Sequence, residues 1–227
     1  MKKKNNPIVV SRDTAIRAAL DAIDEYGLEQ FNMNMVAERL SIRAPSLYYH
    51  FKDKLELLTE VARILLLDAD QEKTEPSADW KEGLVATSLA VRRSIMRHPN
   101  AAPLLLSHPP RHLALSGYER TMKYLEKAGV PADQHMRIVA GLDAISWGSI
   151  LFEAVAVSLG FQLYPVYDPG LFPALARAKK LSPLSDEELF AGTMRTFLAG
   201  LDTQIDTHVA PAAPKAKKPG PKPRKKT

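Results

Sequence analysis

The chain has 227 residues, the length of one large domain or two small ones. Hydrophobic residues make up 45% and charged residues 25%, which excludes a wholly disordered protein, and a cysteine count of zero excludes disulfides, thiolate zinc sites and a cysteine nucleophile. We expect a cytoplasmic protein with neither a secretory signal nor a membrane-spanning segment. The longest uncharged apolar stretch, 154–167, is shorter than the roughly 20 residues that cross a bilayer.

The net charge of +5 is concentrated at the two ends of the chain. Residues 210–227 hold seven of the 31 basic residues and no acidic one, which leaves 24 basic residues against 26 acidic ones. Without Lys2, Lys3 and Lys4 as well, 21 basic residues remain. The body is therefore expected to be acidic, and the overall charge does not by itself indicate nucleic-acid binding.

Helical patterns fill the first third of the chain. Ser11 can cap a first helix that Gly27 ends, and Asn32 can cap a short helix over 33–40. After a break at 41–42, Pro45 suits the first turn of a second short helix over 44–50. Asp53 opens a longer helix.

From residue 77 onward the predicted helices are longer. Helices are expected over 80–97, over 111–128 and over 133–159, and the last of these is apolar on more than one side. Residues 160–183 are expected to be irregular because they contain several prolines. A capping box of Ser185 and Glu188 opens a last helix that runs to about residue 206. The sequence contains no convincing strand pattern, so the predicted fold class is all-α.

Residues 32–54 have the spacing of a helix-turn-helix. Ala37 is small where two short helices would cross, Ser41 lies at the sharp turn, and Ile42 and Leu47 fill the space between the helices. The second helix would then present its N-terminal residues and one face to the major groove. An ordinary helical hairpin satisfies the same spacing, so the spacing alone leaves both interpretations open.

The segment from Arg43 to Lys54, RAPSLYYHFKDK, resembles the recognition-helix motif of the TetR family of bacterial transcription regulators. That motif has a small residue, then Leu-Tyr, an aromatic residue, His, Phe or Val, and Lys-x-Lys. The turn residue is usually glycine in the family, and Ser41 in a left-handed conformation would cost about 1 kcal/mol. The later chain resembles the tetracycline-repressor subclass, with Trp80 opening a helix and His98-Pro99 ending it.

The resemblance implies two helical domains and a homodimer. A three-helix helix-turn-helix domain is expected over 11–58, and a larger effector-binding and dimerisation domain over 59–208. A basic arm over 1–10 would precede them, and a Lys/Pro-rich tail over 209–227 is expected to be disordered because it cannot bury enough apolar surface. Helices near 133–159 and 185–206 would form a four-helix bundle with their mates.

The resemblance also assigns DNA contacts. The residues expected to approach base edges are Asn34, Arg43, Ala44, Pro45, Ser46 and Tyr48, and Arg43 is the one best able to pair bidentately with guanine. The residues expected to contact phosphates are Asn32, Tyr49, His50, Lys52 and Lys54. For Tyr49 and His50, packing roles remain an alternative.

An effector pocket is expected in the second domain. The candidate lining residues, whose helical spacing suits a plain core equally well, are Leu105, His108, His112, Met122, Trp147, Leu151 and Phe152. A small, largely apolar effector fits them better than tetracycline with magnesium. Leu105 takes the position of the metal-ligating histidine of that repressor, and no His/Glu pair at metal spacing replaces it. Neither a metal nor a cofactor is expected.

The predicted function is a dimeric DNA-binding regulator, most simply a repressor that a small effector releases from an inverted-repeat operator. An enzyme is not expected, because the sequence has no recognisable nucleophile–base pair, glycine-rich phosphate loop or metal cluster. The alternative is a nucleoid-associated architectural protein that binds DNA through the basic tail with little sequence preference.

Overall fold

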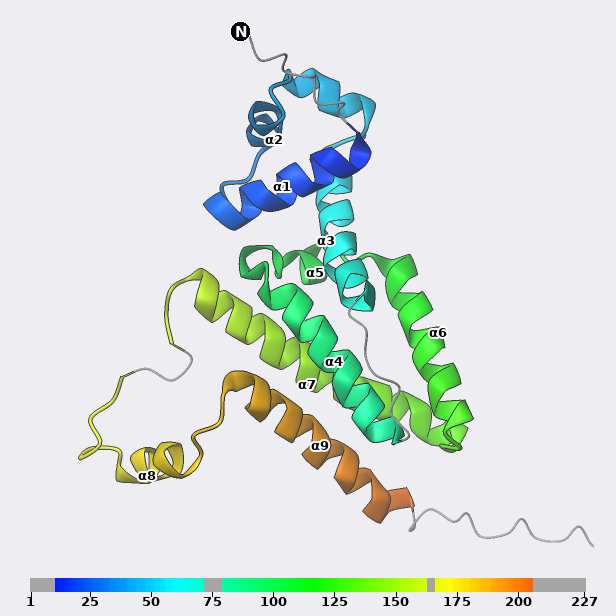
Figure 1. Ribbon diagram of the computed structural model, residues 1–227, viewed down its shortest axis with the longest axis vertical. Coiled ribbons are helices and arrows are strands. Elements are labelled where there is room, and N and C mark those ends of the chain that lie inside the picture. The colour runs from blue at the N-terminus through cyan, green and yellow to red at the C-terminus, as the bar shows by residue number, and fades with distance from the viewer. Residues whose placement is uncertain (1–10, 72–78, 163–165, 206–227) are drawn as a thin grey trace, which may run out of the picture.

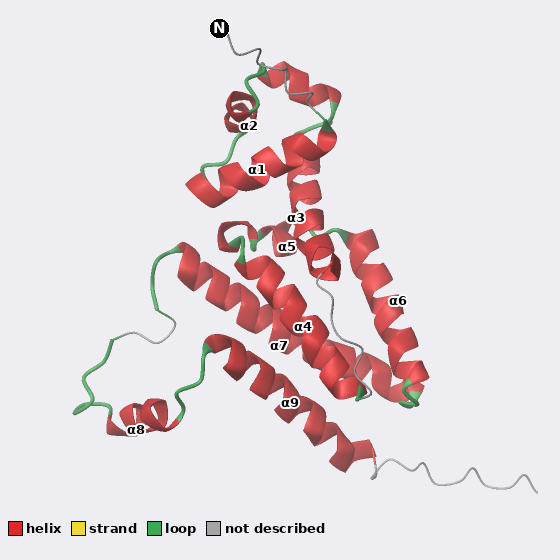
Figure 2. Cartoon of the chain, in the orientation of Figure 1, coloured by secondary structure: helices red, strands yellow, loops and turns green. Residues whose placement is uncertain are grey.

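The computed structural model describes residues 11–71, 79–162 and 166–205, and within these ranges every regular element is a helix (Figure 1, Figure 2). The prediction of an all-α fold is confirmed. The arm expected over 1–10 and the tail expected over 209–227 lie outside the described residues. The elements are α1 (Arg12–Tyr26), α2 (Met33–Arg39), the 3-10 helix η1 (Ala44–Tyr49), α3 (Lys54–Gln71), α4 (Trp80–Met96), the 3-10 helix η2 (Pro99–Ala101), α5 (Leu104–Ser107), α6 (Arg111–Lys127), α7 (Ala132–Ser158), α8 (Pro173–Leu181) and α9 (Asp186–Ile205).

The N-terminal elements enclose a core of their own. Ser11 caps α1 through a reciprocal pair of hydrogen bonds with Thr14, and Gly27 ends the helix at φ 81°. Four side chains are fully or almost fully buried there: Ile23 of α1, Leu47 of η1, Phe51 between η1 and α3, and Leu57 of α3. The first two helices therefore pack on η1 and the start of α3, as a helix-turn-helix domain requires.

The turn between α2 and η1 has the predicted left-handed residue. Ser41 has φ 54°, whereas the other described residues with a positive φ are glycines. Its amide donates to the Glu38 carbonyl at 3.0 Å, and the Ile42 amide donates to the Ala37 carbonyl at 3.0 Å. These bonds satisfy carbonyls at the end of α2, and they let the chain reverse while Ala37 stays buried under η1.

Four long helices form the larger part of the molecule, and α4 is held to α7 and α9 by ion pairs. The nearly buried guanidinium of Arg92 lies 2.5 Å from Glu153 of α7 and 3.4 Å from Glu187 of α9. Midway along α9, Arg195 contacts Glu82 in the first turn of α4 at 2.8 Å. These contacts fix α4 against both late helices, which run beside it in Figure 1.

Close packing within this part depends on one glycine in α7. A Cβ atom added at Gly141 would lie 2.1 Å from Cζ of Phe197 in α9, so the aromatic ring occupies the space that any side chain would need. At this point α7 and α9 are in direct contact.

Helix α7 is apolar on more than one side, as the sequence indicates, because it has several partners. It contacts α4, α6, α9 and η2. By length and composition alone α7 could also cross a membrane, but the core helix of a folded body passes the same test. Its remaining apolar surface includes exposed side chains, among them Met136, Phe152, Val155 and Val157.

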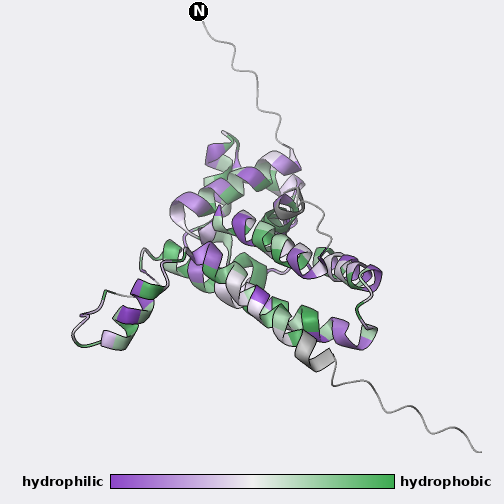
Figure 3. Cartoon of the chain, turned by 60° about the horizontal axis from the view of Figure 1, so that its bottom comes forward, coloured by the Kyte–Doolittle hydropathy of each residue, from purple (hydrophilic) through white to green (hydrophobic). Residues whose placement is uncertain are grey.

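The prediction of an irregular segment over 160–183 is wrong for residues 173–181, which form α8. Pro173 occupies the first helical turn, where its missing N–H costs nothing, and the residues after it are good helix formers. None of the nine residues is buried. Figure 1 places α8 away from the other helices, and Figure 3 shows hydrophobic and hydrophilic residues along it.

Two sets of contacts join the N-terminal elements to the rest. Helix α3 runs unbroken through residues 58 and 59, where the domain boundary is expected, and packs along α4. At the end of α1, the Asp24 carboxylate lies 2.6 Å from Nδ1 of His98, and the Asp24 carbonyl accepts from Asn100 at 2.8 Å. The Asn100 amide oxygen in turn accepts from Ser158 at the end of α7, at 2.5 Å.

Candidate nucleic-acid interface and cavity

The recognition element, η1, is held by its buried side and exposes the other. Leu47 and Phe51 are buried in the N-terminal core, whereas Arg43 and Pro45 are exposed. The side chains of Tyr48 and Tyr49 are 53% and 90% exposed. Tyr49 therefore projects into solvent and does not have the packing role that was left open for it.

The remaining residues of this motif are partly covered or bonded within the fold. Ala44, Ser46 and His50 are half-buried, and the Ser46 amide donates to the Arg43 carbonyl at 2.9 Å. Lys52 is exposed. Lys54 is also exposed, but its ammonium donates to the Phe31 carbonyl at 2.5 Å and lies 5.2 Å from the centre of the Phe31 ring. Lys54 therefore holds the loop before α2.

The two asparagines at the start of α2 have different tasks. The Asn32 side chain accepts from the amides of Asn34 and Met35, at 3.0 and 3.3 Å, and so caps α2 as predicted. Asn34 is exposed on the first turn of α2, and α2 contacts η1. Asn34 thus lies on a helix, α2, that packs directly against η1 and its exposed residues.

Arg12 is a positioning residue that the sequence analysis missed. Its guanidinium donates to the His50 carbonyl at the end of η1, and it contacts the carboxylates of Glu56 and Glu60 on α3 at 2.6 and 3.4 Å. It also lies 4.7 Å from the centre of the Phe51 ring. The helix dipole disfavours a cation in the first turn of a helix. An arginine at that position in the sequence is therefore a signal that a specific partner stabilises its charge.

Glu56 completes this arrangement. Its carboxylate accepts from the Lys52 amide at 2.7 Å and from Arg12. The Lys52 amide, followed by the Arg12 side chain, lowers the pKa of Glu56 below its ordinary value of 4.5. The ionised carboxylate therefore ties the chain after η1 to the start of α1 at neutral pH.

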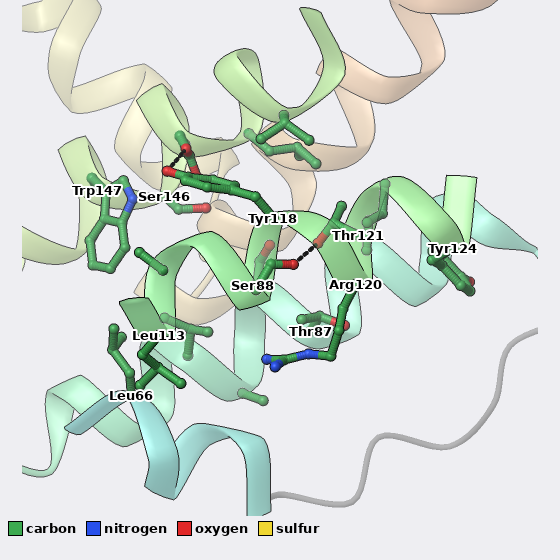
Figure 4. A pocket seen from close by; sticks show the side chains of 18 residues that line it. Leu66, Thr87, Ser88, Leu113, Tyr118, Arg120, Thr121, Tyr124, Ser146 and Trp147 are labelled. Atoms are coloured by element: carbon green, nitrogen blue, oxygen red, sulfur yellow. Dashed lines mark hydrogen bonds between the residues drawn. The ribbon is translucent and has the colours of Figure 1, made fainter. Parts of the chain in front are cut away.

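A cavity of about 420 Å³ lies between α4, α6 and α7, and Leu66 of α3 forms part of its wall (Figure 4). Its lining consists of Leu66, Leu84, Thr87, Ser88, Ala90, Val91, Leu113, Ala114, Gly117, Tyr118, Arg120, Thr121, Tyr124, Val139, Leu142, Asp143, Ser146 and Trp147. Most of this surface is apolar, and the volume lies within the usual range for small-molecule sites.

This cavity includes one of the seven predicted effector residues, Trp147. Leu105 is buried in the core, and Phe152 is 61% exposed. The other four residues, His108, His112, Met122 and Leu151, are also absent from its lining. Among the described residues, no group of three or more His, Asp or Glu side chains could hold a metal ion.

Tyr118 and Asp143 form a polar pair in the lining. The Tyr118 hydroxyl donates to the Asp143 carboxylate at 2.7 Å, and this bond, with burial and the negative charge, raises the pKa of Tyr118 to about 12. Figure 4 places the Tyr118 hydroxyl on the side of Ser146 and Trp147, whereas the guanidinium of Arg120 lies by Thr87.

Comparisons with known proteins agree with this architecture. The family model for bacterial regulatory proteins of the tetR family matches residues 15–61, and the model for the tetracycline repressor-like C-terminal domain matches residues 73–205. The class A tetracycline repressor from transposon 1721 of Escherichia coli is 27% identical over 143 residues, which cover 62% of this chain and 66% of the relative. The class D repressor of the same organism is 22% identical over 198 residues, which cover 86% of this chain and 91% of the relative.

Solved structures with the same fold include two regulators from Streptomyces coelicolor A3(2). One, a putative transcriptional regulator, has 27% identity and a TM-score of 0.62, with 86% of this chain and 98% of that chain covered. The other, a possible TetR family transcriptional regulator, has 23% identity and a TM-score of 0.69, with 86% and 100% covered. Together with the two family matches, which extend over both parts of the fold, these similarities establish that the chain belongs to the TetR family of bacterial transcription regulators, with a C-terminal domain of the tetracycline-repressor type.

Proposed function

We propose that this protein is a dimeric repressor that binds an inverted-repeat operator and leaves it when a small molecule occupies the cavity. The observation that carries the proposal is the exposed side of η1, where Arg43, Tyr48 and Tyr49 project from an element fixed by buried Leu47 and Phe51. Side chains exposed on a rigidly held helix suit reading of the major groove.

The proposed contacts divide into base edges and phosphates. Arg43 and Asn34 are the side chains best suited to bidentate pairing, with guanine and adenine respectively. Ala44, Pro45, Ser46 and Tyr48 would approach base edges beside them. Tyr49, His50 and Lys52 would contact phosphates with Asn32, and Lys54 would do so while it remains bonded to the loop before α2.

We propose that the dimer forms through α7 and α9 as a four-helix bundle. Exposed apolar side chains on α7, including Phe152 and Val155, and Leu189 on α9 support this. In such a dimer the two η1 helices would enter successive major grooves about 34–36 Å apart. We keep the division into a DNA-binding domain over 11–58 and an effector domain over 59–208, with α3 as the element that belongs to both.

Response to a ligand is supported by the composition of the cavity wall. Leu66 lies on the same helix as Leu57, which is buried in the N-terminal core. A ligand that contacts Leu66 therefore touches the helix that carries the DNA-binding elements. Because only differential affinity for two states can shift their equilibrium, the effector must favour a position of α3 that binds DNA poorly. Such a regulator would act in the cytoplasm, at the nucleoid.

The test is a selection of bound sequences from random duplex DNA at about 150 mM salt. The full chain and a version ending at Val209 are compared with Arg43→Ala and with Arg177→Ala. Arg177 is an exposed arginine on α8, so the control changes the charge equally but far from η1.

We expect the two wild-type versions and Arg177→Ala to enrich one inverted repeat, and Arg43→Ala to lose preference at one base pair of each half-site. If Arg43→Ala selects the unchanged site, η1 does not read bases through that residue. If only the full chain binds and nothing is enriched, the architectural role of the basic tail replaces the repressor hypothesis.

A further inference from the structure

Three hydroxyl groups in the cavity wall donate their protons to acceptors within the protein. Tyr118 donates to Asp143 at 2.7 Å, Thr87 donates to the Gly83 carbonyl at 2.9 Å, and Thr121 donates to the Gly117 carbonyl at 3.1 Å. A hydroxyl whose proton is engaged can only accept from a ligand, and an ionised carboxylate can only accept. These four side chains therefore present acceptors to whatever occupies the cavity.

The carboxylate and an aromatic ring lie on the same face of α7. Trp147 follows Asp143 by four residues, so both side chains project from neighbouring positions on the helix, and both line the cavity. A carboxylate beside an aromatic face favours a cation, through charge pairing and through attraction to the ring. Asp143 is bonded to Tyr118, and Figure 4 places Trp147 on the same side of the cavity as the Tyr118 hydroxyl.

The rest of the wall suits an apolar body. Leu84, Val91 and Leu142 contribute aliphatic surface, together with Leu66 and Leu113. The positive charge in the lining, on Arg120, lies by Thr87 and not at the Tyr118–Asp143 pair, so the carboxylate remains the charged group at that end.

We infer that the effector is an amphipathic organic cation, an apolar molecule with a protonated amine whose ammonium group binds Asp143 and Tyr118 next to the ring of Trp147. This inference rests on the proposed function, because it names the chemical class of the ligand that the proposed repressor senses. The Asp143 carboxylate binds the cation, and Tyr118 orients the carboxylate.

The experiment uses Trp147 as its reporter. The chain has two tryptophans, so Trp80→Phe leaves Trp147 as the single tryptophan, whose emission is excited selectively over that of the tyrosines at long wavelength. The probes are decylammonium, decanol and decanoate, because they share a ten-carbon chain and carry a positive, a neutral and a negative head group. The two ions are used below their micelle concentrations and decanol below its solubility limit. The variants are Asp143→Asn and, as the matched control, Asp133→Asn, an exposed aspartate on α7 outside the cavity lining.

We expect decylammonium to give a saturable change in Trp147 emission with at least about tenfold higher affinity than the other two probes. Asp143→Asn should abolish this preference and leave decanol binding unchanged, whereas Asp133→Asn should behave as wild type. Tyr118→Phe should keep the preference, because the charge remains. Equal or tighter binding of decanoate, an unchanged preference in Asp143→Asn, or no saturable response to any probe would each overturn the inference.

Binding to the DNA selected above, measured on the same samples, separates this inference from the proposed function. Decylammonium should weaken DNA binding in wild type and not in Asp143→Asn. If the probes fail while an inverted repeat is still selected, the ligand class is wrong and the regulator assignment stands. If no DNA sequence is selected but the cation binds, the repressor proposal fails.

Discussion

Replacing Arg12 should loosen η1 without changing any side chain that we propose to contact DNA. Arg12→Met keeps an unbranched apolar side chain but removes the guanidinium, and with it the bond to the His50 carbonyl, the ion pairs with Glu56 and Glu60, and the contact with the Phe51 ring. Any effect on η1 must then arise from the lost contacts of the guanidinium. Arg17→Met, on the exposed side of α1, is the matched control.

The size of the effect follows from the exposure of each contact. The Arg12 side chain is 41% exposed, so its ion pairs contribute about 0–1 kcal/mol after screening by solvent. The bond to the partly buried His50 carbonyl contributes about 1–3 kcal/mol, because its loss leaves that acceptor poorly satisfied. A total of about 2 kcal/mol corresponds to a change of about 30-fold in the local opening equilibrium.

Native-state hydrogen exchange measures this opening directly. The amides of His50 and Phe51 donate to the Leu47 carbonyl at 2.9 and 3.0 Å, so they report on the end of η1. Both should exchange about 30-fold faster in Arg12→Met and at the wild-type rate in Arg17→Met. Exchange within about threefold of wild type in Arg12→Met would refute the positioning role.

Two further substitutions test the packing and the pH dependence. Gly141→Ala should cost about 1–3 kcal/mol of unfolding free energy in urea, because the new Cβ would collide with Phe197, whereas Gly117→Ala on α6 should gain about 0.5–1 kcal/mol from helix propensity. Similar shifts in both variants would contradict the close approach of α7 and α9. Because the pKa of Glu56 is lowered in the fold, its contribution to stability is present above its ordinary pKa and is lost as the pH falls through the lowered value. Glu56→Gln should therefore be less stable than wild type near neutral pH, and the difference should close as the pH falls below 4.5 and through the lowered pKa. A difference in unfolding free energy, followed by circular dichroism, that persists in acid would argue against the ionised carboxylate.

Local signals in the sequence predicted the DNA-binding elements well because caps and turns depend on neighbouring residues. The caps at Ser11 and Asn32 and the left-handed residue at Ser41 all occur where they are predicted. The prediction of an irregular segment at α8 was wrong because it treated Pro173 as a helix breaker, whereas Pro173 lies in the first turn, where proline is tolerated.

The cavity could not be located from the sequence because its lining depends on how each helix is rotated in the fold. Apolar side chains such as Leu105 and Phe152 share helical spacing with core residues, and the structure places one in the core and the other on the surface. The residues that line the cavity lie largely on α4 and α6, and Tyr118 and Asp143 come together only when α6 packs on α7. Arg12 was missed for the same reason, since its partners lie far along the chain.

The continuity of α3 makes it a lever arm. Its 18 residues extend about 27 Å, and about 18 Å separates Leu66 at the cavity from Lys54 at the edge of the DNA-binding elements. A tilt of about 10° at the cavity end would move the other end by about 3 Å. In a two-fold symmetric dimer both arms would swing, so the separation of the η1 helices would change by about 6 Å, nearly two base-pair steps of the roughly 34–36 Å that successive major grooves demand. A ligand no larger than the cavity could therefore change the spacing of the two η1 helices through a tilt of about 10° in α3.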